Sequence, residues 1–222
     1  MPVWGSLYFQ NACSPVMEQL IFFHDHTMIV LIVITVLVGY MLIKSVVMNS
    51  FNRMMSEGQE LESVWTILPG VFLLFIAFPS LKLLYMMEEM DNPELTLKST
   101  GRQWYWVYEY ADLGSSVYES YMIPSGEEEK FRLVEVDNCL VVPVNTCVRM
   151  IVGSGDVIHS WTVPALGVSA DGIPGRLNQV LFEAFRSGIY VGQCSEICGA
   201  NHSFMPVVME VVSKSDFLKE WE

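Results

Sequence analysis

Two long segments without a charged residue limit what this chain can fold into. Residues 27–43 read TMIVLIVITVLVGYMLI and residues 63–81 read SVWTILPGVFLLFIAFPSL. Since a helix rises about 1.5 Å per residue, each segment with its flanking turns can cross a hydrocarbon core of about 30 Å. Two buried helices of a soluble protein are the alternative, but the rest of the chain is too short to cover both on all sides. We therefore expect a transmembrane hairpin within residues 1–90, with spans at about residues 20–46 and 62–85.

The basic residues give this hairpin an orientation. The loop between the two segments carries Lys44 and Arg53, whereas residues 1–26 contain no Lys or Arg. Basic residues are enriched in loops on the inner side of a membrane, so we expect the loop inside and both termini outside. The chain starts with neither an Arg-rich presequence nor a short cleavable signal, and we expect its first residues to belong to the mature protein.

From about residue 91 the sequence changes to a composition typical of strands. β-branched and aromatic runs are separated by Gly, Pro, Asp and Ser, which predicts a small antiparallel sandwich or barrel over residues 91–222. The runs are LTLKSTGRQWYWVYEY (95–110), KFRLVEV (130–136), LVVPVNTCVRMIVG (140–153) and MPVVMEVV (205–212). The net charge of −13 excludes nucleic acid as an expected partner, and it suits either a basic protein partner or simple solubility.

One of these runs predicts a buried aromatic face. Alternation along a strand places Trp104, Trp106, Tyr108 and Tyr110 on the same side. Aromatic residues in such a pattern most often belong to the core of a domain.

The densest set of metal-binding residue types lies near the end of the chain. Cys194, Cys198, His202 and Met205 fall within a Gly-punctuated segment that leads into the last predicted strand. Thiolate, imidazole and thioether together favour copper over magnesium or calcium, and a weak thioether ligand distinguishes a copper electron-transfer site from a structural zinc site. A pair of cysteines alone would indicate buried thiols or a local disulfide, but the four residue types together indicate a metal site.

A second imidazole for this site is expected from His159, in the segment GDVIHSW. The chain has four histidines, and His24 and His26 precede the first apolar segment, where we expect them at the membrane interface. A mononuclear blue-copper site needs one Cys, so the second Cys suggests thiolates that bridge two copper ions. The chain lacks C-x-x-C-H, which excludes a c-type haem.

The chain resembles subunit II of mitochondrial cytochrome c oxidase over essentially its whole length. The resemblance rests on FFHDHTMIVLI, EGQELESVWTILP, PSLKLLYMMEE, GRQWYWVYEY, FRLVEVDN, DVIHSWTVPALGV, IPGRLNQ and GQCSEICGANHSFMP. It implies a two-helix hairpin in the mitochondrial inner membrane, with an all-β cupredoxin-like Greek-key domain in the intermembrane space. It also implies that electrons pass from cytochrome c to a dinuclear copper centre, CuA, and then to haem in subunit I. Oxygen is reduced to water in that partner, coupled to proton translocation.

The same resemblance assigns roles to single residues. It implies that CuA is bound by His159, Cys194, Cys198, His202, Met205 and the main-chain carbonyl of Glu196. The carboxylate of Glu196 would help to hold a magnesium ion shared with subunit I. Electrons would enter at Trp104, and Glu62 would lie at the mouth of a proton path into subunit I. Other oxidase subunits and membrane lipid are further expected partners.

Acidic residues of the outer domain are expected to form a docking surface for cytochrome c. The candidates are Glu109, Asp112, Asp137 and Asp156, although solubility alone would also explain them. The chain departs from the family pattern at Gly155, where relatives often carry an acid, and this weakens one contribution to docking. Cys139 and Cys147 also depart from it, and we expect them to be thiols without a metal.

Two other functions fit parts of the pattern. A structural subunit of a quinol oxidase would share the architecture but lack the copper ligands, which are all present here. A copper delivery protein would need neither two spans nor Trp104 beside an acidic face.

Overall fold

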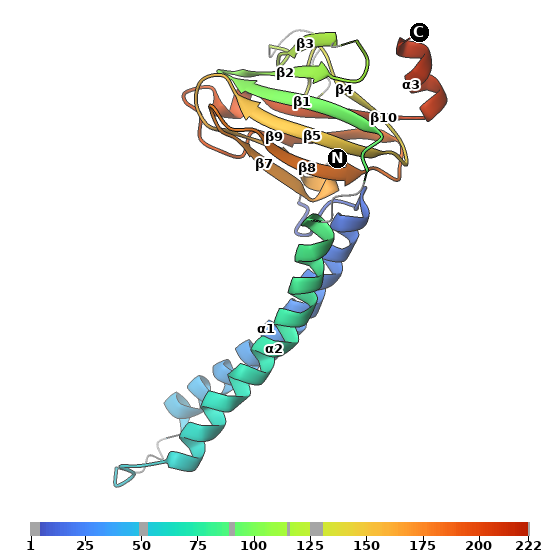
Figure 1. Cartoon of the computed structure of the whole chain (residues 1–222). Coiled ribbons are helices and arrows are strands. Elements are labelled where there is room, and N and C mark those ends of the chain that lie inside the picture. Colours follow the sequence, from blue (N-terminus) through green and yellow to red (C-terminus); the bar gives the residue numbers. More distant parts are fainter. Residues whose placement is uncertain (1–4, 49–52, 89–91, 115, 125–130, 222) are drawn as a thin grey trace. The chain divides into compact units, whose positions relative to one another are not determined.

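The computed structural model describes residues 5–48, 53–88, 92–114, 116–124 and 131–221. Within these, the chain forms two units (Figure 1). One unit is the helical hairpin, residues 19–88, and the other is the β unit, which combines residues 5–18 with residues 92–221.

The helical hairpin consists of α1 (Pro15–Val47), which begins in the β unit, and α2 (Gln59–Glu88). Both helices have the length and apolar composition to cross a membrane, and their most apolar windows contain no buried residue. In water so many exposed apolar side chains would be unfavourable, whereas in lipid they face a solvent as apolar as themselves. The two predicted spans lie inside these helices.

A histidine compensates for one of the prolines in α2. Pro79 has no N–H, so the carbonyl of Phe75 one turn earlier lacks its usual helical donor. His26 Nε2 lies 3.2 Å from that oxygen and can supply a hydrogen bond from α1. Such replacement of a lost backbone bond is what allows proline inside a membrane helix. His26 therefore lies within α1 and pairs the two helices.

In its described residues, the β unit contains ten strands in three sheets, two short 3₁₀ turns and a terminal helix. The largest sheet has the order β3 (Ser116–Ser120), β2 (Tyr105–Tyr110), β1 (Leu95–Arg102), β5 (Cys147–Ser154) and β8 (Asn178–Glu183). A second sheet has the order β4 (Leu140–Pro143), β10 (Pro206–Val212) and β9 (Gly188–Gln193), and β6 (His159–Val163) pairs with β7 (Val168–Gly172). The 3₁₀ turns are η1 (Pro164–Leu166) and η2 (His202–Phe204), and the helix is α3 (Lys214–Trp221).

The strand pairing differs from the predicted antiparallel sandwich in two places. β1 pairs with β5 in parallel, and β4 pairs with β10 in parallel. Both pairs join strands that are far apart in the sequence, so no hairpin turn dictates their direction. The predicted strand at residues 130–136 is wrong over its described part, because residues 131–134 form a turn and only Val136 makes an isolated bridge.

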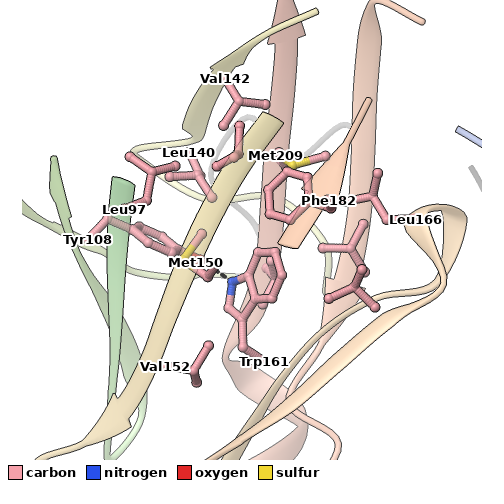
Figure 2. Close-up of a cluster of buried hydrophobic side chains, with 14 of the residues drawn as sticks. Leu97, Tyr108, Leu140, Val142, Met150, Val152, Trp161, Leu166, Phe182 and Met209 are labelled. Atoms are coloured by element: carbon pink, nitrogen blue, oxygen red, sulfur yellow. Dashed lines mark hydrogen bonds between the residues drawn. The ribbon is translucent and has the colours of Figure 1, made fainter. Parts of the chain in front are cut away.

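Buried side chains from the three sheets form one main core. Figure 2 shows part of it, with residues Leu97, Tyr108, Leu140, Val142, Met150, Val152, Trp161, Leu166, Phe182 and Met209. Trp161 stacks on Phe182 at a ring separation of 6.0 Å and directs its Nε1 to the Tyr108 hydroxyl at 3.4 Å. The prediction of a buried aromatic face is confirmed for Trp106, Tyr108 and Tyr110.

Residues 5–18 belong to the β unit, although the sequence placed them with the hairpin. The Cys13 N–H donates to the Ala165 carbonyl at 2.8 Å, and the Cys13 side chain is fully buried. The Ser14 hydroxyl donates to the Leu166 carbonyl at 2.6 Å and accepts the Met17 N–H at 3.0 Å. Ser14 therefore caps the start of α1 and also ties it to η1.

We expect the substitution Ser14→Ala to lower the free energy of unfolding of the β unit by about 1–3 kcal/mol, because it removes a cap and leaves a buried carbonyl without its donor. Urea unfolding of the detergent-solubilised chain, followed by tryptophan fluorescence, measures this. Ser45→Ala is the matched control, since that hydroxyl bonds only within exposed α1. Equal effects of the two substitutions would contradict the assignment of residues 5–18 to the β unit.

Candidate metal centre

Three parts of the β unit bring potential metal ligands together. His159 is the first residue of β6, Cys194 directly follows β9, and Met205 directly precedes β10. The segment after β9 is tied to β6, because the Ser195 N–H donates to the Ser160 carbonyl at 3.1 Å. β9 also approaches β6 so closely at Gly192 that a Cβ there would lie 1.8 Å from the Thr162 carbonyl oxygen.

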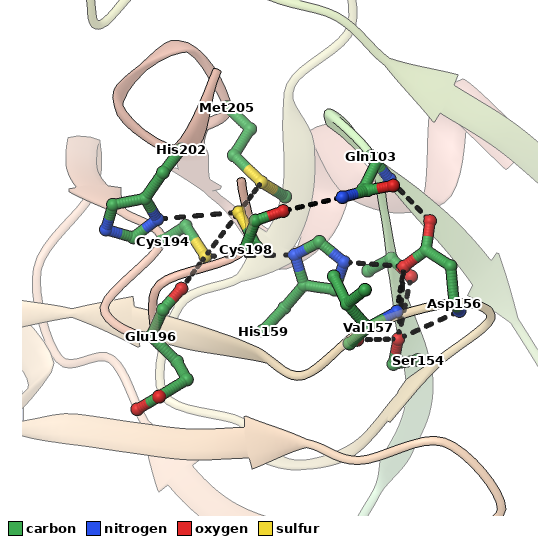
Figure 3. A network of polar contacts seen from close by, with 11 residues as sticks. Gln103, Ser154, Asp156, Val157, His159, Cys194, Glu196, Cys198, His202 and Met205 are labelled. Carbon is green, nitrogen blue, oxygen red and sulfur yellow. Dashed lines mark hydrogen bonds and ion pairs between the residues drawn. The ribbon is translucent and has the colours of Figure 1, made fainter. Parts of the chain in front are cut away.

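Two thiols and two imidazoles converge at this place (Figure 3). The sulfur atoms of Cys194 and Cys198 lie 4.0 Å apart. His159 Nδ1 is 3.9 Å from the Cys194 sulfur, and His202 Nδ1 is 3.5 Å from the Cys198 sulfur. His159 and both cysteines are buried, whereas His202 is partly exposed. The donor atoms of His159, Cys194 and Cys198 all lie within 4.8 Å of one another, which suits a metal site.

A thioether and a carbonyl complete the cluster. The Met205 Sδ lies 3.5 Å from the Cys198 sulfur, and Met205 is buried. The main-chain carbonyl of Glu196 lies 3.3 Å from the Cys194 sulfur, while the Glu196 carboxylate points away from the sulfur atoms (Figure 3). All six residues that the sequence singled out for copper therefore lie together.

The adjoining ends of β1 and β2 pack against these donors. The Trp106 indole N–H donates to the Met205 carbonyl at 3.3 Å, and its ring meets the His159 ring edge-on at 5.9 Å. Gly101 leaves room for the imidazole, because a Cβ there would lie 2.7 Å from ring atoms of His159. Any larger residue at Gly101 would displace this ring.

Electrostatics distinguish the two thiols. Burial opposes ionisation of Cys194, but its hydrogen bonds, above all from His159, lower the pKa of that thiol to about 7. Burial and the neighbouring Cys194 sulfur raise the pKa of Cys198 to about 12. The site therefore accepts one negative charge readily and resists a second until a cation is bound. This donor set of adjacent thiolates, imidazoles and a thioether fits copper and does not fit magnesium or calcium.

Comparison with known proteins assigns this combination of hairpin and donor cluster to a family. Residues 95–212 match the cytochrome c oxidase subunit II periplasmic domain, and residues 2–83 match the transmembrane domain of the same subunit. The chain belongs to the cytochrome c oxidase subunit II family. Membership confirms the predicted fold class of a two-helix transmembrane hairpin followed by a cupredoxin-like β domain. It also makes the chain the electron-transfer subunit of a terminal oxidase, and thus a component of an enzyme and a membrane protein.

Individual relatives are similar over nearly the whole chain. Cytochrome c oxidase subunit 2 of Yponomeuta malinellus is 56% identical over 221 residues, which cover 99% of this chain and 97% of that protein. The subunit of Drosophila yakuba is 55% identical with the same coverage. The crystal structure of the periplasmic domain of subunit II from Bradyrhizobium japonicum is 44% identical, with a TM-score of 0.57, and covers 60% of this chain and 94% of that one.

Trp104 lies beside the cluster and not on a strand. It occupies the turn before β2, where its partly exposed ring packs against the segment that carries the cysteines. A Cβ added at Gly199, the neighbour of Cys198, would lie 3.2 Å from the Trp104 ring nitrogen. The prediction that Trp104 shares the buried face of β2 is therefore wrong. Its ring instead contacts the loop between β9 and β10 that carries the two cysteines.

The predicted docking carboxylates all have partners within the β unit. Glu109 pairs with the Lys98 ammonium at 3.3 Å. Asp112 accepts the Thr96 N–H at 2.7 Å, and Asp137 accepts N–H groups that include that of Tyr121 at 2.8 Å. These acids therefore also stabilise turns and strand ends.

Three other singled-out residues lie outside the donor cluster. Glu62 is exposed in the first turn of α2. Cys139, before β4, and Cys147, the first residue of β5, are half-buried thiols away from the cluster. Sequence reasoning missed Trp106 and Gln103 as neighbours of the donors, since no local pattern links them to residues about 100 positions later.

We expect the metal-free chain to show one thiolate that forms as the pH rises through about 7, because the pKa of Cys194 is lowered to about 7. A lowered thiol pKa means that the charge is present above that pH and is lost below it. Ultraviolet thiolate absorbance across a pH titration measures this step. Cys194→Ser should abolish it and Cys139→Ser should retain it; persistence in Cys194→Ser would contradict the assignment.

Proposed function

We propose that this subunit accepts electrons from cytochrome c at a dinuclear copper centre and passes them to haem in subunit I. In that partner oxygen is reduced to water, coupled to proton translocation. The observation that carries the proposal is the 4.0 Å approach of the sulfurs of Cys194 and Cys198, flanked by imidazole and thioether donors. One Cys would suffice for a single copper ion, so the second favours a pair.

Each donor has its own role at the copper centre. The copper ligands are His159, Cys194, Cys198, His202, Met205 and the main-chain carbonyl of Glu196. When bound, the copper pair supplies a one-electron redox couple. The thiols of Cys194 and Cys198 would be shared between the two ions, the imidazoles of His159 and His202 would each hold one of them, and the Met205 thioether would be the weak ligand that adjusts the potential. β9 and β10 pair at Gln193 and Pro206 and so fix both ends of the loop that carries the sulfur donors, while β6 holds His159. The donors should therefore move little when the charge changes.

Residues around the centre provide the entry point for electrons, a magnesium ligand and the docking surface for cytochrome c. Residues 194–205, between β9 and β10, form the copper loop. Electrons enter at Trp104, whose ring packs on this loop at Gly199. The Glu196 carboxylate, directed away from the sulfurs, is free to help hold a magnesium ion shared with subunit I. An acidic surface that includes Glu109, Asp112 and Asp137 attracts basic cytochrome c, and Asp156 adds to it.

The location of the chain follows from the same function. The hairpin spans the mitochondrial inner membrane in contact with lipid, and both termini lie in the intermembrane space, which agrees with Lys44 and Arg53 in the inner loop. Glu62, exposed near the start of α2, lies at the mouth of a proton path into subunit I. Subunit I and the other oxidase subunits cover the apolar faces that lipid does not.

The test of the function is copper stoichiometry. We expect the purified oxidase to hold two copper ions that depend on this chain, with one unpaired electron shared between both nuclei. Elemental analysis and electron paramagnetic resonance measure these quantities, with Cys194→Ser as the variant that should lose both ions. One ion per chain, or an electron on a single nucleus, would overturn the dinuclear proposal.

Substitution of single ligands should separate the bridging from the weak donors. Met205→Leu keeps the volume of the side chain and should leave both copper ions bound, with a shifted reduction potential. Cys198→Ser should lose the centre, because an alcohol is a poor bridge between soft ions. Potentiometry and copper analysis compare the two. Identical copper loss in both variants would contradict this division of roles.

A further inference from the structure

Both carboxylate oxygens of Asp156 accept hydrogen bonds from residues at the metal centre. One oxygen, Oδ1, accepts a hydrogen bond from His159 Nε2 at 2.8 Å and another from the Val157 N–H at 2.6 Å. The other oxygen, Oδ2, accepts the Gln103 N–H at 2.7 Å. The Ser154 hydroxyl lies 3.5 Å from Oδ1 as a further donor. A carboxylate that faced only a docking partner would not need these internal donors.

His159 depends on this carboxylate for its orientation. Its side chain is fully buried, and its Nδ1 faces the Cys194 sulfur at 3.9 Å. Donation of the Nε2 proton to Asp156 leaves Nδ1 with its lone pair directed at the cluster. A carboxylate behind an imidazole is the usual way in which a protein fixes the ring and tautomer of a metal ligand.

Gln103 links Asp156 to the copper loop through hydrogen bonds. Its side-chain Nε2 donates to the Cys198 carbonyl at 2.7 Å, while its main-chain N–H is held by Asp156. The next residue is Trp104, which packs on the neighbouring Gly199. Asp156 and Gln103 thus join His159, Cys198 and the Trp104 turn through hydrogen bonds that Figure 3 shows.

We infer that Asp156 and Gln103 are positioning residues. They hold the turn at residues 103–104, which carries Trp104, and the metal ligands in one fixed arrangement. The inference rests on the proposed function and deepens it. Asp156 then acts mainly through His159 and Gln103. Asp137, whose carboxylate accepts the main-chain N–H groups of Tyr121 and Asn138, acts through its charge. Removal of the Asp156 charge should therefore change the centre itself, and not only the approach of cytochrome c.

The experiment compares four variants of the purified oxidase: Asp156→Asn, Gln103→Met, Asp137→Asn and Asp216→Asn. Asp216 is the matched control, because its carboxylate bonds to Ser213 and Lys219 around α3, away from the donor cluster. The readouts are copper affinity by chelator competition, the absorption spectrum and reduction potential of the centre, and hydrogen exchange at the amide of residue 103. The rate of electron uptake from cytochrome c is measured at 0.01 M and 0.1 M salt, where the Debye length is about 30 Å and about 10 Å.

We expect Asp156→Asn to lower copper affinity about 10- to 100-fold, to shift the spectrum and potential at both salt concentrations, and to speed exchange at residue 103. Gln103→Met should shift the spectrum but keep that amide protected, since its main-chain bond to Asp156 remains. Asp137→Asn should slow uptake only at low salt, and Asp216→Asn should match the parent in every readout.

An unaltered spectrum, potential and amide exchange in Asp156→Asn, with a rate that equals the parent at 0.1 M salt, would overturn the inference and leave only a docking role. If Asp156→Asn fails to assemble, an unaltered spectrum in Gln103→Met overturns it equally. A parent oxidase without two copper ions would instead overturn the proposed function, so the two failures are distinguishable.

Discussion

The close burial of two ionisable thiols beside an imidazole is the constraint on which this structure depends. Without a cation, the negative charge on Cys194 opposes a second charge on Cys198. Both thiols are buried, so little water is present to screen the two charges. Cys198 therefore stays protonated near neutral pH, and the scaffold holds the two sulfurs 4.0 Å apart. Metal binding replaces this repulsion with bonds and releases the thiol protons.

The β unit supplies that scaffold from segments far apart in the sequence. β6 brings His159, the loop between β9 and β10 brings the sulfur donors, and the turn between β1 and β2 closes over both. Strand pairing on each side of the loop leaves few backbone angles free. An electron-transfer centre benefits from such rigidity, because little has to rearrange when the charge changes.

The two units of the chain suit different environments, lipid for the hairpin and water for the β unit. The hairpin exposes apolar side chains that suit lipid or other membrane helices. Its backbone hydrogen bonds are made within the hairpin, even at Pro79, where His26 can replace the missing donor. The β unit instead buries its apolar side chains in a core and exposes its acids. Residues 5–18 are part of that unit and Cys13 lies in its core, so the start of α1 is anchored in the β unit.

The sequence by itself determined the features that depend on local pattern. Uncharged runs indicated both membrane helices, alternation indicated the buried face of β2, and the spacing of Cys194 to Met205 indicated a copper site. Only the tertiary structure decided which distant residues meet. The parallel pairs, the turn at residues 131–134, the place of Trp104 and the contacts of Gln103 with Cys198 all depend on strands brought together across long stretches of chain. Hydrophobic periodicity fixes which face of a strand is buried, but it carries no information about the partner that covers it.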